Sequence, residues 1–340
     1  MSKKYPKNKF FHNKTILITG GTGSLGQAIL NFFLKKKIPL KKIIIFSRDE
    51  LKQLNMQDKL STRDLKKIRF FIGDIRDKER FKTALNGVHY VIHAAALKQV
   101  PTAEYNPFEF IKTNIIGTEN VVQACLEKEV ERAILISTDK ASSPVNLYGA
   151  TKLCADKLFI SANNIKGNKD IKFSVVRYGN VMGSRGSVLH KFYDQKKNGT
   201  LFLTDKNMTR FNITLDQAIE VIIWSLQNCL GGEIVVPKLS SFYVKDLAKA
   251  VSFKSKIKIT GVRPGEKIHE EMISLFDAPN TIEIKKYYII LQKRLVEKYR
   301  AKNNSNKFVN TNFCYRSDTN KNFLSINNLE KIIYNLKLKE

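Results

Sequence analysis

The sequence predicts an α/β protein with a Rossmann-like doubly wound parallel sheet and a smaller C-terminal substrate-binding domain. Short β-branched apolar stretches alternate with helical segments over the first two-thirds of the chain, which is typical of βαβ units and a parallel sheet. A glycine-rich turn follows the first of these stretches directly. The alternation loosens past Gly183, so we expect residues 1–182 to form the sheet domain. Residues 183–340 should form mainly the second domain, with elements of the two parts interleaved.

The first predicted strand, residues 15–19, is a β-branched apolar run typical of a buried parallel strand. A glycine turn and then a helical pattern of apolar residues follow it. In this context the glycines permit a tight turn, and a pyrophosphate can approach the backbone N–H groups at the helix N-terminus. We therefore predict a nicotinamide cofactor that contacts Gly20, Thr22, Gly23, Ser24, Leu25 and Gly26.

The second predicted strand, residues 42–46, ends in the sequence Ser47-Arg48-Asp49. NAD-binding versions of this fold carry an acidic residue here for the ribose 2′-hydroxyl, whereas an arginine accommodates a 2′-phosphate. Ser47 and Arg48 come first after the strand, and Lys52 lies within a turn of them, which favours NADP. Asp49 keeps NAD open, because its carboxylate could bind the ribose.

Four further strands are predicted at residues 70–75, 91–96, 132–137 and 172–177. The third strand of the sheet should place Asp74 near the adenine. The fourth ends in small residues, among them Ala94 and Ala95, which leave room for the cofactor. His93 in that strand could be a general base, but a histidine in an apolar strand is usually a hydrogen-bonded core residue, and we favour this interpretation.

Residues 137–152 hold two pairs of reactive side chains. Tyr148 and Lys152 are four residues apart, so a helix places them on one face, where the ammonium favours the phenolate and makes it a base toward an alcohol. Asp139 and Lys140 follow the fifth strand, at the edge of the sheet where ligands bind. A simple alcohol dehydrogenase has no obvious use for this second pair. Together the pairs indicate oxidation of a sugar hydroxyl followed by proton transfers on the carbonyl compound; for Asp139-Lys140 the alternative is a surface turn.

Composition limits the other classes of function. The net charge is +28, but the 59 basic residues are spread along the chain and no nucleic-acid-binding motif is present, so we expect no nucleic-acid partner. No apolar run approaches the ~18 residues of a membrane span, and the first residues are too polar for a signal peptide. The four cysteines are far apart, which argues against disulfides and a metal site. We therefore expect a cytoplasmic protein without membrane association.

The second part of the chain is predicted to contain short strands at residues 201–204 and 233–237 and helices near 214–229 and 243–252. Helical periodicity also runs from Ile326 to Leu338. Residues 301–322 are rich in Asn, Lys, Ser and Thr, which predicts a long surface excursion away from the motifs above.

The motifs resemble those of the extended short-chain dehydrogenase/reductases, and within them the inverting UDP-N-acetylglucosamine 4,6-dehydratases that begin pseudaminic acid synthesis for flagellin glycosylation. The resemblance covers about residues 13–270, with a weaker match at 315–317. The triplet Thr138-Asp139-Lys140 selects this subfamily, because the retaining enzymes have Thr-Asp-Glu there. The other matching motifs lie at residues 19–26, 47–52, 93–98, 146–152, 176–181, 208–211 and 263–267.

This resemblance implies a mechanism. Tyr148, assisted by Lys152, takes the proton of the sugar 4-hydroxyl while NADP accepts hydride from C4. Lys140 then removes the C5 proton, Asp139 protonates the leaving 6-hydroxyl, the hydride returns to C6, and C5 is reprotonated on the opposite face. Lys140 can be a base only when it is neutral, which requires a lowered pKa of the kind that burial gives.

The resemblance also implies contacts for UDP-N-acetylglucosamine and for the cofactor. Arg210 and Arg263 suit the pyrophosphate, because a guanidinium binds phosphate oxygens bidentately. The further substrate candidates are Lys98, Thr138, Asn180, Thr204 and Glu266, and the further cofactor candidates are Ile75, Asn114 and Val181.

Three other functions stay open at this point. A UDP-N-acetylhexosamine 4-epimerase and a retaining dehydratase share the oxidation step, although an epimerase has no need for Asp139-Lys140. A non-catalytic protein that senses NADP or binds polyanions could keep the same fold. The resemblance further implies a homo-oligomer.

Overall fold

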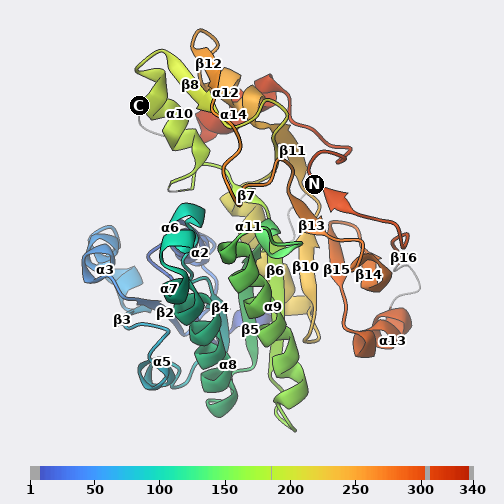
Figure 1. Ribbon diagram of the computed structural model, residues 1–340. Coiled ribbons are helices and arrows are strands. Elements are labelled where there is room, and N and C mark those ends of the chain that lie inside the picture. Colours follow the sequence, from blue (N-terminus) through green and yellow to red (C-terminus); the bar gives the residue numbers. More distant parts are fainter. Residues whose placement is uncertain (1–7, 185, 303–306, 337–340) are drawn as a thin grey trace.

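The computed structural model describes residues 8–184, 186–302 and 307–336, and its described strands include a large central sheet in the order β16-β14-β15-β10-β6-β5-β4-β1-β2-β3 (Figure 1). The strands from β3 to β10 run parallel, and the remaining ones extend this sheet in antiparallel pairs. The predicted Rossmann-like α/β fold is thereby confirmed. The parallel strands are β1 (Thr15–Thr19), β2 (Lys42–Ser47), β3 (Ile68–Ile72), β4 (Tyr90–His93), β5 (Arg132–Thr138), β6 (Lys172–Tyr178) and β10 (Ile234–Pro237). The antiparallel strands are β14 (Thr281–Glu283), β15 (Tyr287–Ile290) and β16 (Lys307–Phe308).

Two of the predicted strands end earlier than expected. The third ends at Ile72, because Asp74 accepts a hydrogen bond from the N–H of Arg76 and turns the chain. The fourth ends at His93, because the N–H groups of Ala94 and Ala95 donate to the Thr19 hydroxyl and so leave the β ladder. Both ends therefore open into loops at the carboxyl edge of the sheet.

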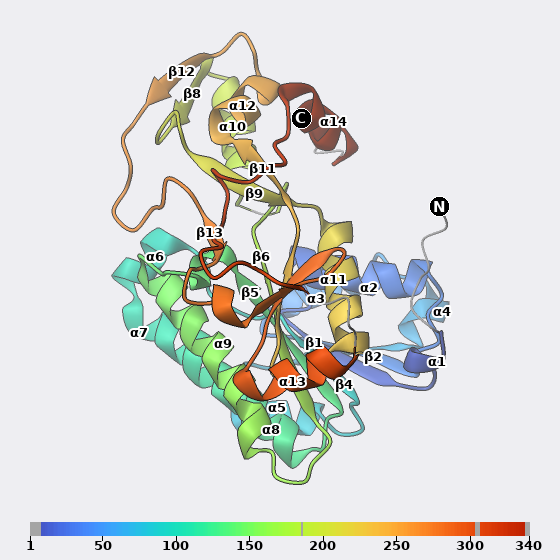
Figure 2. The same ribbon diagram turned by 90° about the vertical axis from the view of Figure 1, so that its right-hand side faces the viewer.

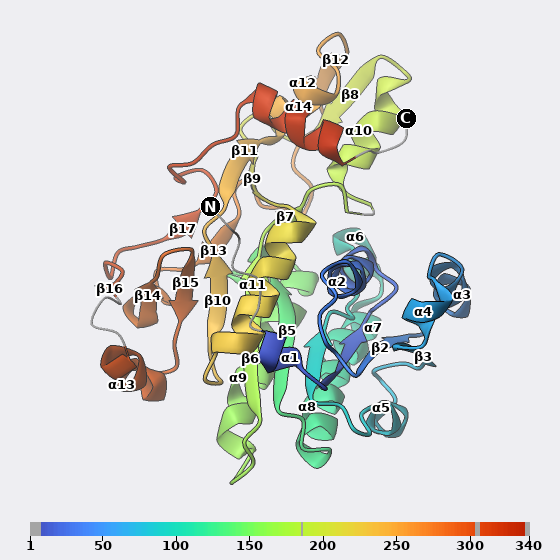
Figure 3. The same cartoon turned by 180° about the vertical axis from the view of Figure 1, so that it is seen from behind.

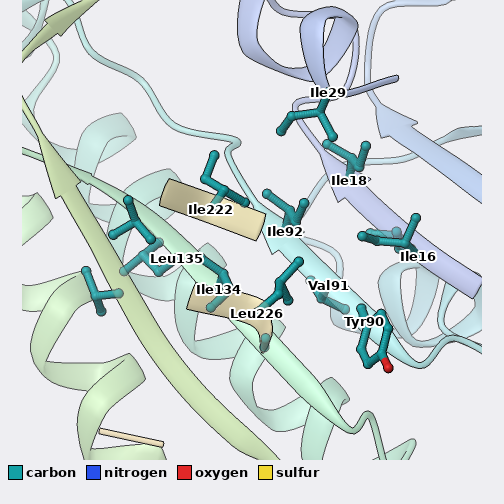
Figure 4. Close-up of a cluster of buried hydrophobic side chains, with 14 of the residues drawn as sticks. Ile16, Ile18, Ile29, Tyr90, Val91, Ile92, Ile134, Leu135, Ile222 and Leu226 are labelled. Carbon is teal, nitrogen blue, oxygen red and sulfur yellow. The ribbon is translucent and has the colours of Figure 1, made fainter. Parts of the chain in front are cut away.

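Helices cover both faces of the sheet. α2 (Ser24–Lys35) and α11 (Leu215–Asn228) pack on one face, and α5 (Lys78–Ala84), α8 (Gly117–Glu127) and α9 (Leu147–Ile165) on the other (Figures 1 and 3). Figure 4 shows part of the resulting core, where Ile29 of α2 and Ile222 and Leu226 of α11 lie against the apolar side chains of β1, β4 and β5. The remaining helical segments around the sheet are α1 (Asn8–Phe11), α3 (Glu50–Gln57), α4 (Thr62–Leu65), α6 (Val100–Tyr105), α7 (Pro107–Phe110), η1 (Ile111–Ile116), η2 (Asp139–Ala141), η3 (Ala278–Asn280) and α13 (Lys293–Lys302).

A smaller lobe lies beyond the carboxyl edge of the parallel strands (Figure 2). It contains α10 (Val188–Lys196), α12 (Val244–Val251), α14 (Ile326–Asn335), β8 (Thr200–Leu203) and β12 (Lys256–Ile259), and it has its own core, in which Phe192, Leu247 and Leu329 are fully buried. The small sheet of β7 (Asn180–Val181), β9 (Thr209–Ile213) and β11 (Ser240–Tyr243) connects the lobe to the large sheet. The helices predicted near 214–229, 243–252 and 326–338 are present as α11, α12 and α14; residues 337 and 338 lie outside the described residues.

The chain crosses between the two parts several times after residue 182. Residues 188–203 and 244–259 belong to the small lobe, whereas β10, β14, β15 and β16 belong to the large sheet. The large sheet therefore continues beyond residue 182. The division of the chain at that residue into a cofactor-binding part and a substrate-binding part stays a prediction.

Where the structure describes it, the predicted surface excursion at residues 301–322 pairs with the large sheet and, separately, with strand β13. β16 pairs with β14, and β17 (Tyr315–Arg316) pairs with β13 (Glu271–Ile273). Residues 303–306 lie outside the described residues. Across the described part of the chain, the helices are too short or too polar to cross a membrane.

Candidate active site

A cavity of about 1900 Å³ lies between the carboxyl ends of the parallel strands and the small lobe. Of the predicted site residues, Asp139 and Asn114 do not line it. The others line this one cavity: Gly20, Thr22, Gly23, Ser24, Leu25, Gly26, Ser47, Arg48, Asp49, Lys52, Asp74, Ile75, Ala94, Ala95, Lys98, Thr138, Lys140, Tyr148, Lys152, Asn180, Val181, Thr204, Arg210, Arg263 and Glu266. The fold therefore brings together residues from the whole length of the chain.

The glycine turn forms one end of the cavity. Gly20 has a positive φ of 63°, and a Cβ there would lie 3.0 Å from the backbone of Ala95. A Cβ on Gly26 would clash with the Gly21 carbonyl oxygen, so this glycine lets α2 start directly against the turn. Among the described side chains none caps the N-terminus of α2. Its first N–H groups thus face the cavity as an anion site, which fits the pyrophosphate of a dinucleotide.

Charged side chains surround the part of the cavity next to β2. The Asp49 carboxylate caps α3, accepting from the N–H of Lys52 at 2.9 Å and pairing with the Lys52 ammonium. The hydrogen bonds from Lys52 lower the pKa of the Asp49 carboxyl. The Arg48 side chain is 53% exposed and lies 3.5 Å from the Asp74 carboxylate. The Asp49 carboxylate therefore already binds α3, while Arg48 lines the cavity with its side chain half exposed.

Tyr148 and Lys152 lie on α9 as predicted, and their surroundings differ. The Lys152 Nζ donates to the Ile136 carbonyl on β5 at 2.9 Å, and burial lowers the pKa of Lys152 to about 8 although Asp156 opposes the shift. Burial raises the pKa of Tyr148 to about 12, against the ammonium of Lys140 and a hydrogen bond with Thr138. The cation that favours the phenolate in this structure is thus Lys140.

Lys140 lies between two carboxylates. Its Nζ is 3.1 Å from Oδ1 of Asp139 and 2.8 Å from Oε1 of Glu270. Burial alone would lower the pKa of Lys140, but the two carboxylates outweigh it and raise that pKa above its ordinary value. The lowered pKa that a base at Lys140 requires is therefore opposed in this structure by the two carboxylates, which favour the ammonium.

Asp139 is buried behind this ammonium, at 1% exposure. Its Oδ1 accepts from the Thr138 hydroxyl at 2.9 Å and from Lys140, and its Oδ2 has no hydrogen-bond partner among the described residues. Burial and the charge of Glu270 raise the pKa of Asp139, against the attraction of Lys140. A raised pKa suits a proton donor, and the Thr138 hydroxyl and the Lys140 ammonium connect Asp139 to the cavity.

The two arginines predicted for the pyrophosphate differ in their surroundings. The guanidinium of Arg210 donates to the carbonyls of Thr209, Ile268 and Lys267 at 2.7, 2.9 and 2.9 Å, so its donors are occupied by the backbone. The side chain of Arg263 is 55% exposed at the cavity, and its ion-pair partner among the residues that the structure describes is Glu266, at 3.5 Å. Arg263 is therefore the arginine with donors free for a phosphate in this geometry.

Asn114 of η1 and His93 of β4 have structural partners. Asn114 was predicted to contact the cofactor, but its amide binds both backbone groups of Leu97 at 2.9 Å and the Thr151 hydroxyl at 3.0 Å, so it fixes the loop after β4 instead. His93 bonds to the hydroxyls of Thr19 at 2.7 Å and Thr118 at 3.2 Å, and burial lowers its pKa to about 3. It is the hydrogen-bonded core histidine that the sequence favoured.

Glu270 and Ser317 were not predicted as parts of the site. Glu270 is 1% exposed, lines the cavity, and lies three residues beyond the motif at 263–267 that the sequence singled out. Ser317 exchanges two hydrogen bonds with the backbone of Glu270, at 2.8 and 2.9 Å. The expectation that residues 301–322 lie away from the motifs is therefore wrong, because the pairing of β17 with β13 carries Ser317 to the site. The weak match at 315–317 was the signal in the sequence.

A Rossmann-like sheet, a glycine turn at the N-terminus of α2, and a Tyr-x-x-x-Lys pair in the same cavity define an extended short-chain dehydrogenase/reductase. Within that class the chain belongs to the family described as "Polysaccharide biosynthesis protein", whose pattern matches residues 16–292. In the described residues there is no group of three or more His, Cys, Asp or Glu side chains that could hold a metal ion.

Three relatives are informative. The chain is 48% identical over 95% of its length, and 98% of the relative's, to a UDP-N-acetylglucosamine 4,6-dehydratase (inverting) of Campylobacter jejuni. It is 42% identical to a UDP-glucose 4-epimerase of Rickettsia rickettsii, over 82% of this chain and 83% of that one. The solved structure of Pen from Bacillus thuringiensis has a TM-score of 0.88 at 38% identity, covering 97% of this chain and 99% of that one.

Proposed function

We propose that this protein is a UDP-N-acetylglucosamine 4,6-dehydratase that inverts C5, giving a UDP-2-acetamido-2,6-dideoxy-4-keto-L-arabino-hexose. The observation that carries the proposal is the position of Asp139 and Lys140 beside Tyr148 at the tip of β5. An alcohol oxidation alone uses only the tyrosine, so an acid and an amine at the same place indicate that proton transfers follow it. The C. jejuni relative named as an inverting dehydratase supports the same substrate.

The reaction has two parts, oxidation at C4 and elimination of water, and different residues carry each part. A nicotinamide cofactor held by the glycine turn and the start of α2 would supply the hydride acceptor for C4 and the hydride donor for C6. Tyr148 takes the proton of the 4-hydroxyl, and the positive charge of Lys140 favours its phenolate form. Lys140 then takes the C5 proton, and Asp139, whose pKa is raised by burial, supplies a proton for the departing 6-hydroxyl.

Lys140 and Asp139 can become base and acid together without exchanging protons with solvent. In the structure Lys140 is an ammonium 3.1 Å from the Asp139 carboxylate. Transfer of one proton along this hydrogen bond gives a neutral amine and a carboxylic acid, which are the forms that the elimination needs. The ordinary pKa order opposes this transfer, but burial disfavours both charges and so reduces the difference.

For the cofactor we propose NADP. Asp49 caps α3, whereas Arg48 is half exposed at the cavity with Lys52 beside it. A guanidinium in this position suits a 2′-phosphate. The glycine turn and the uncapped start of α2 would hold the pyrophosphate.

The wider setting is also a proposal. The product would enter pseudaminic acid synthesis for flagellin or surface glycosylation, and a cytoplasmic location stays a prediction. A homo-oligomer is supported by the exposed apolar side chains Tyr105, Phe108 and Ile116 on the helical segment from α6 to η1. Light scattering of the purified protein would measure its subunit number.

The proposed activity is tested by incubating the protein with UDP-N-acetylglucosamine in deuterated water and following the sugar by NMR and mass spectrometry. Loss of one water, deuterium at C5 and the L-arabino configuration are expected. Water loss with retained C5 configuration would place the enzyme among the retaining dehydratases. A product of unchanged mass apart from exchange would indicate an epimerase, as in the R. rickettsii relative, and would contradict the roles of Asp139 and Lys140.

A further inference from the structure

Glu270 is a buried carboxylate in the cavity with no role in the mechanism above. Its Oε1 is 2.8 Å from Nζ of Lys140, closer than the Asp139 oxygen at 3.1 Å. Its Oε2 is buried without a hydrogen-bond partner among the described residues. Burying a carboxylate costs folding free energy unless the charge is paired, which indicates that Glu270 has a role at this position.

The backbone of Glu270 is fixed by a different part of the chain. The Glu270 N–H donates to the Ser317 hydroxyl, and the Ser317 N–H donates to the Glu270 carbonyl. The Ser317 hydroxyl also lies 2.7 Å from the hydroxyl of Thr209 on β9. Glu270 therefore reaches Lys140 from a rigid support that includes neither β5 nor α9.

The charged groups around Lys140 come from several elements. Asp139 adjoins it in η2, and Glu270 precedes β13. Arg210 of β9 lies 3.6 Å from Glu270, and the charges of Arg210 and Lys267 both act on this cluster. The positive charge of Lys140 also acts on Tyr148 of α9 and favours its phenolate form. Lys140 is thus in direct contact with two carboxylates, those of Asp139 and Glu270. The two cations, Arg210 and Lys267, lie farther from it.

We propose that Glu270 is a positioning residue for the dehydration: it holds the Lys140 amine at the cavity wall and, as a second counter-ion, sets the pH range in which the Asp139–Lys140 pair can act as base and acid. The inference rests on the proposed dehydratase function. Asp139 alone could accept the proton of Lys140, but Glu270 stabilises the ammonium and so opposes that transfer. Burial would raise the pKa of the Glu270 carboxyl, yet Lys140 and Arg210 lower it, so the carboxylate keeps its charge.

The direction of the effect follows from charge. Removing an anion that contacts an ammonium lowers the pKa of that ammonium, by about 1–3 units for a partner at this distance. The elimination needs the Asp139–Lys140 pair to hold one proton between them, so its rate rises with pH as the pair, protonated on both groups at low pH, loses its first proton. The charge of Glu270 raises the pKa of both groups. In Glu270→Gln the rising limb of water loss should therefore move to lower pH.

The experiment uses the full chain with its cofactor bound and follows two steps in single-turnover reactions across pH. Absorbance of the reduced cofactor reports oxidation at C4, and mass spectrometry reports loss of water. For Glu270→Gln we expect the rising limb of the pH–rate profile of water loss to shift to lower pH by about 1–3 pH units. The rising limb of oxidation should stay at the wild-type pH. Glu270→Asp keeps the negative charge, so its water-loss limb should lie close to that of the wild type.

Glu271→Gln is the matched control. This neighbouring carboxylate binds the hydroxyls of Ser142 and Ser143 and the thiol of Cys314, and it does not contact Lys140. Its removal should leave both limbs in place. If Glu270→Gln does not fold, Ser317→Ala, which removes one of the two hydrogen bonds that fix the Glu270 backbone, should move the water-loss limb in the same direction by a smaller amount.

The outcomes separate the inference from the function on which it rests. A wild-type protein that dehydrates the substrate, together with a Glu270→Gln limb at the wild-type pH, would overturn the role of Glu270 alone. Loss of both steps in folded Glu270→Gln would also overturn it, because a general structural role predicts that result. A wild-type product of unchanged mass would reject the dehydratase function itself and the inference with it.

Discussion

The buried ion pair between α9 and β6 permits a quantitative test through Asp156→Asn. The Asp156 carboxylate lies 3.2 Å from the guanidinium of Arg177, and the two side chains are 0% and 3% exposed. Asparagine has nearly the same shape, so the substitution removes the charge without opening a cavity. Arg177 then stays buried with the Met272 carbonyl at 3.0 Å and the Asp277 carboxylate at 3.5 Å.

The expected loss of stability is about 3 kcal/mol. Removing one partner of a buried pair costs ~3–5 kcal/mol, because the other charge is left uncompensated in a low dielectric. Since Arg177 keeps two weaker partners, the lower end of this range applies. The same change also affects the active site, because Asp156 lies one turn from Lys152 on α9 and opposes the lowering of its pKa, which stands at about 8. In the variant the pKa of Lys152 should fall further.

The assay is urea unfolding at neutral pH, compared with Asp170→Asn as the control. Asp170 also pairs with a cation, Lys172 at 3.5 Å, but its side chain is 91% exposed, so its removal should change the unfolding free energy by less than ~1 kcal/mol. Equal unfolding free energies for the two variants would refute the argument that burial makes the Asp156–Arg177 pair important.

Three further predictions concern the cavity. Arg48→Ala should weaken NADP binding ~10-fold by loss of a charge-assisted hydrogen bond and leave NAD binding unchanged, as measured by calorimetry; equal losses for both would reject the 2′-phosphate role. Gly26→Ala should abolish cofactor retention, because its Cβ would meet the Gly21 carbonyl oxygen, and the bound nucleotide of the purified variant measures this. Lys140→Met should slow water loss by ~10²–10⁴, the usual contribution of a general base, while single-turnover hydride transfer persists at a reduced rate because Tyr148 also loses the Lys140 charge; full dehydratase activity would remove the base assignment.

The sequence was informative where local pattern and chemistry coincide. β1 has the bounds that the apolar run at residues 15–19 predicts, and the helix α9 carries Tyr148 and Lys152 on one face. Each of these features depends on residues close together in the chain. The convergence of the motifs in one cavity also followed, because parallel strands bring their carboxyl ends to one edge.

The sequence did not reveal what depends on distant contacts. A lysine four residues after a tyrosine predicts proximity, but not that the Ile136 carbonyl would bind the ammonium. Likewise burial alone suggested a lowered pKa for Lys140, whereas the second carboxylate that reverses the shift lies 130 residues away, at position 270. Charge balance in a buried site is set by the assembled fold, and one motif holds only part of it.

The pairing of β10 with β6 has a consequence for dividing this chain. β10 supplies the hydrogen-bonding partner along Val175 and Val176 of β6, strands that lie in the interior of the large sheet. A fragment ending at residue 182 would keep the glycine turn and the Tyr148 helix but expose β6 as a bare, apolar sheet edge. Such edges recruit other strands and lead to aggregation. Engineering that swaps substrate specificity should therefore graft the small-lobe segments 188–203 and 244–259 and keep the strands that return to the large sheet in place.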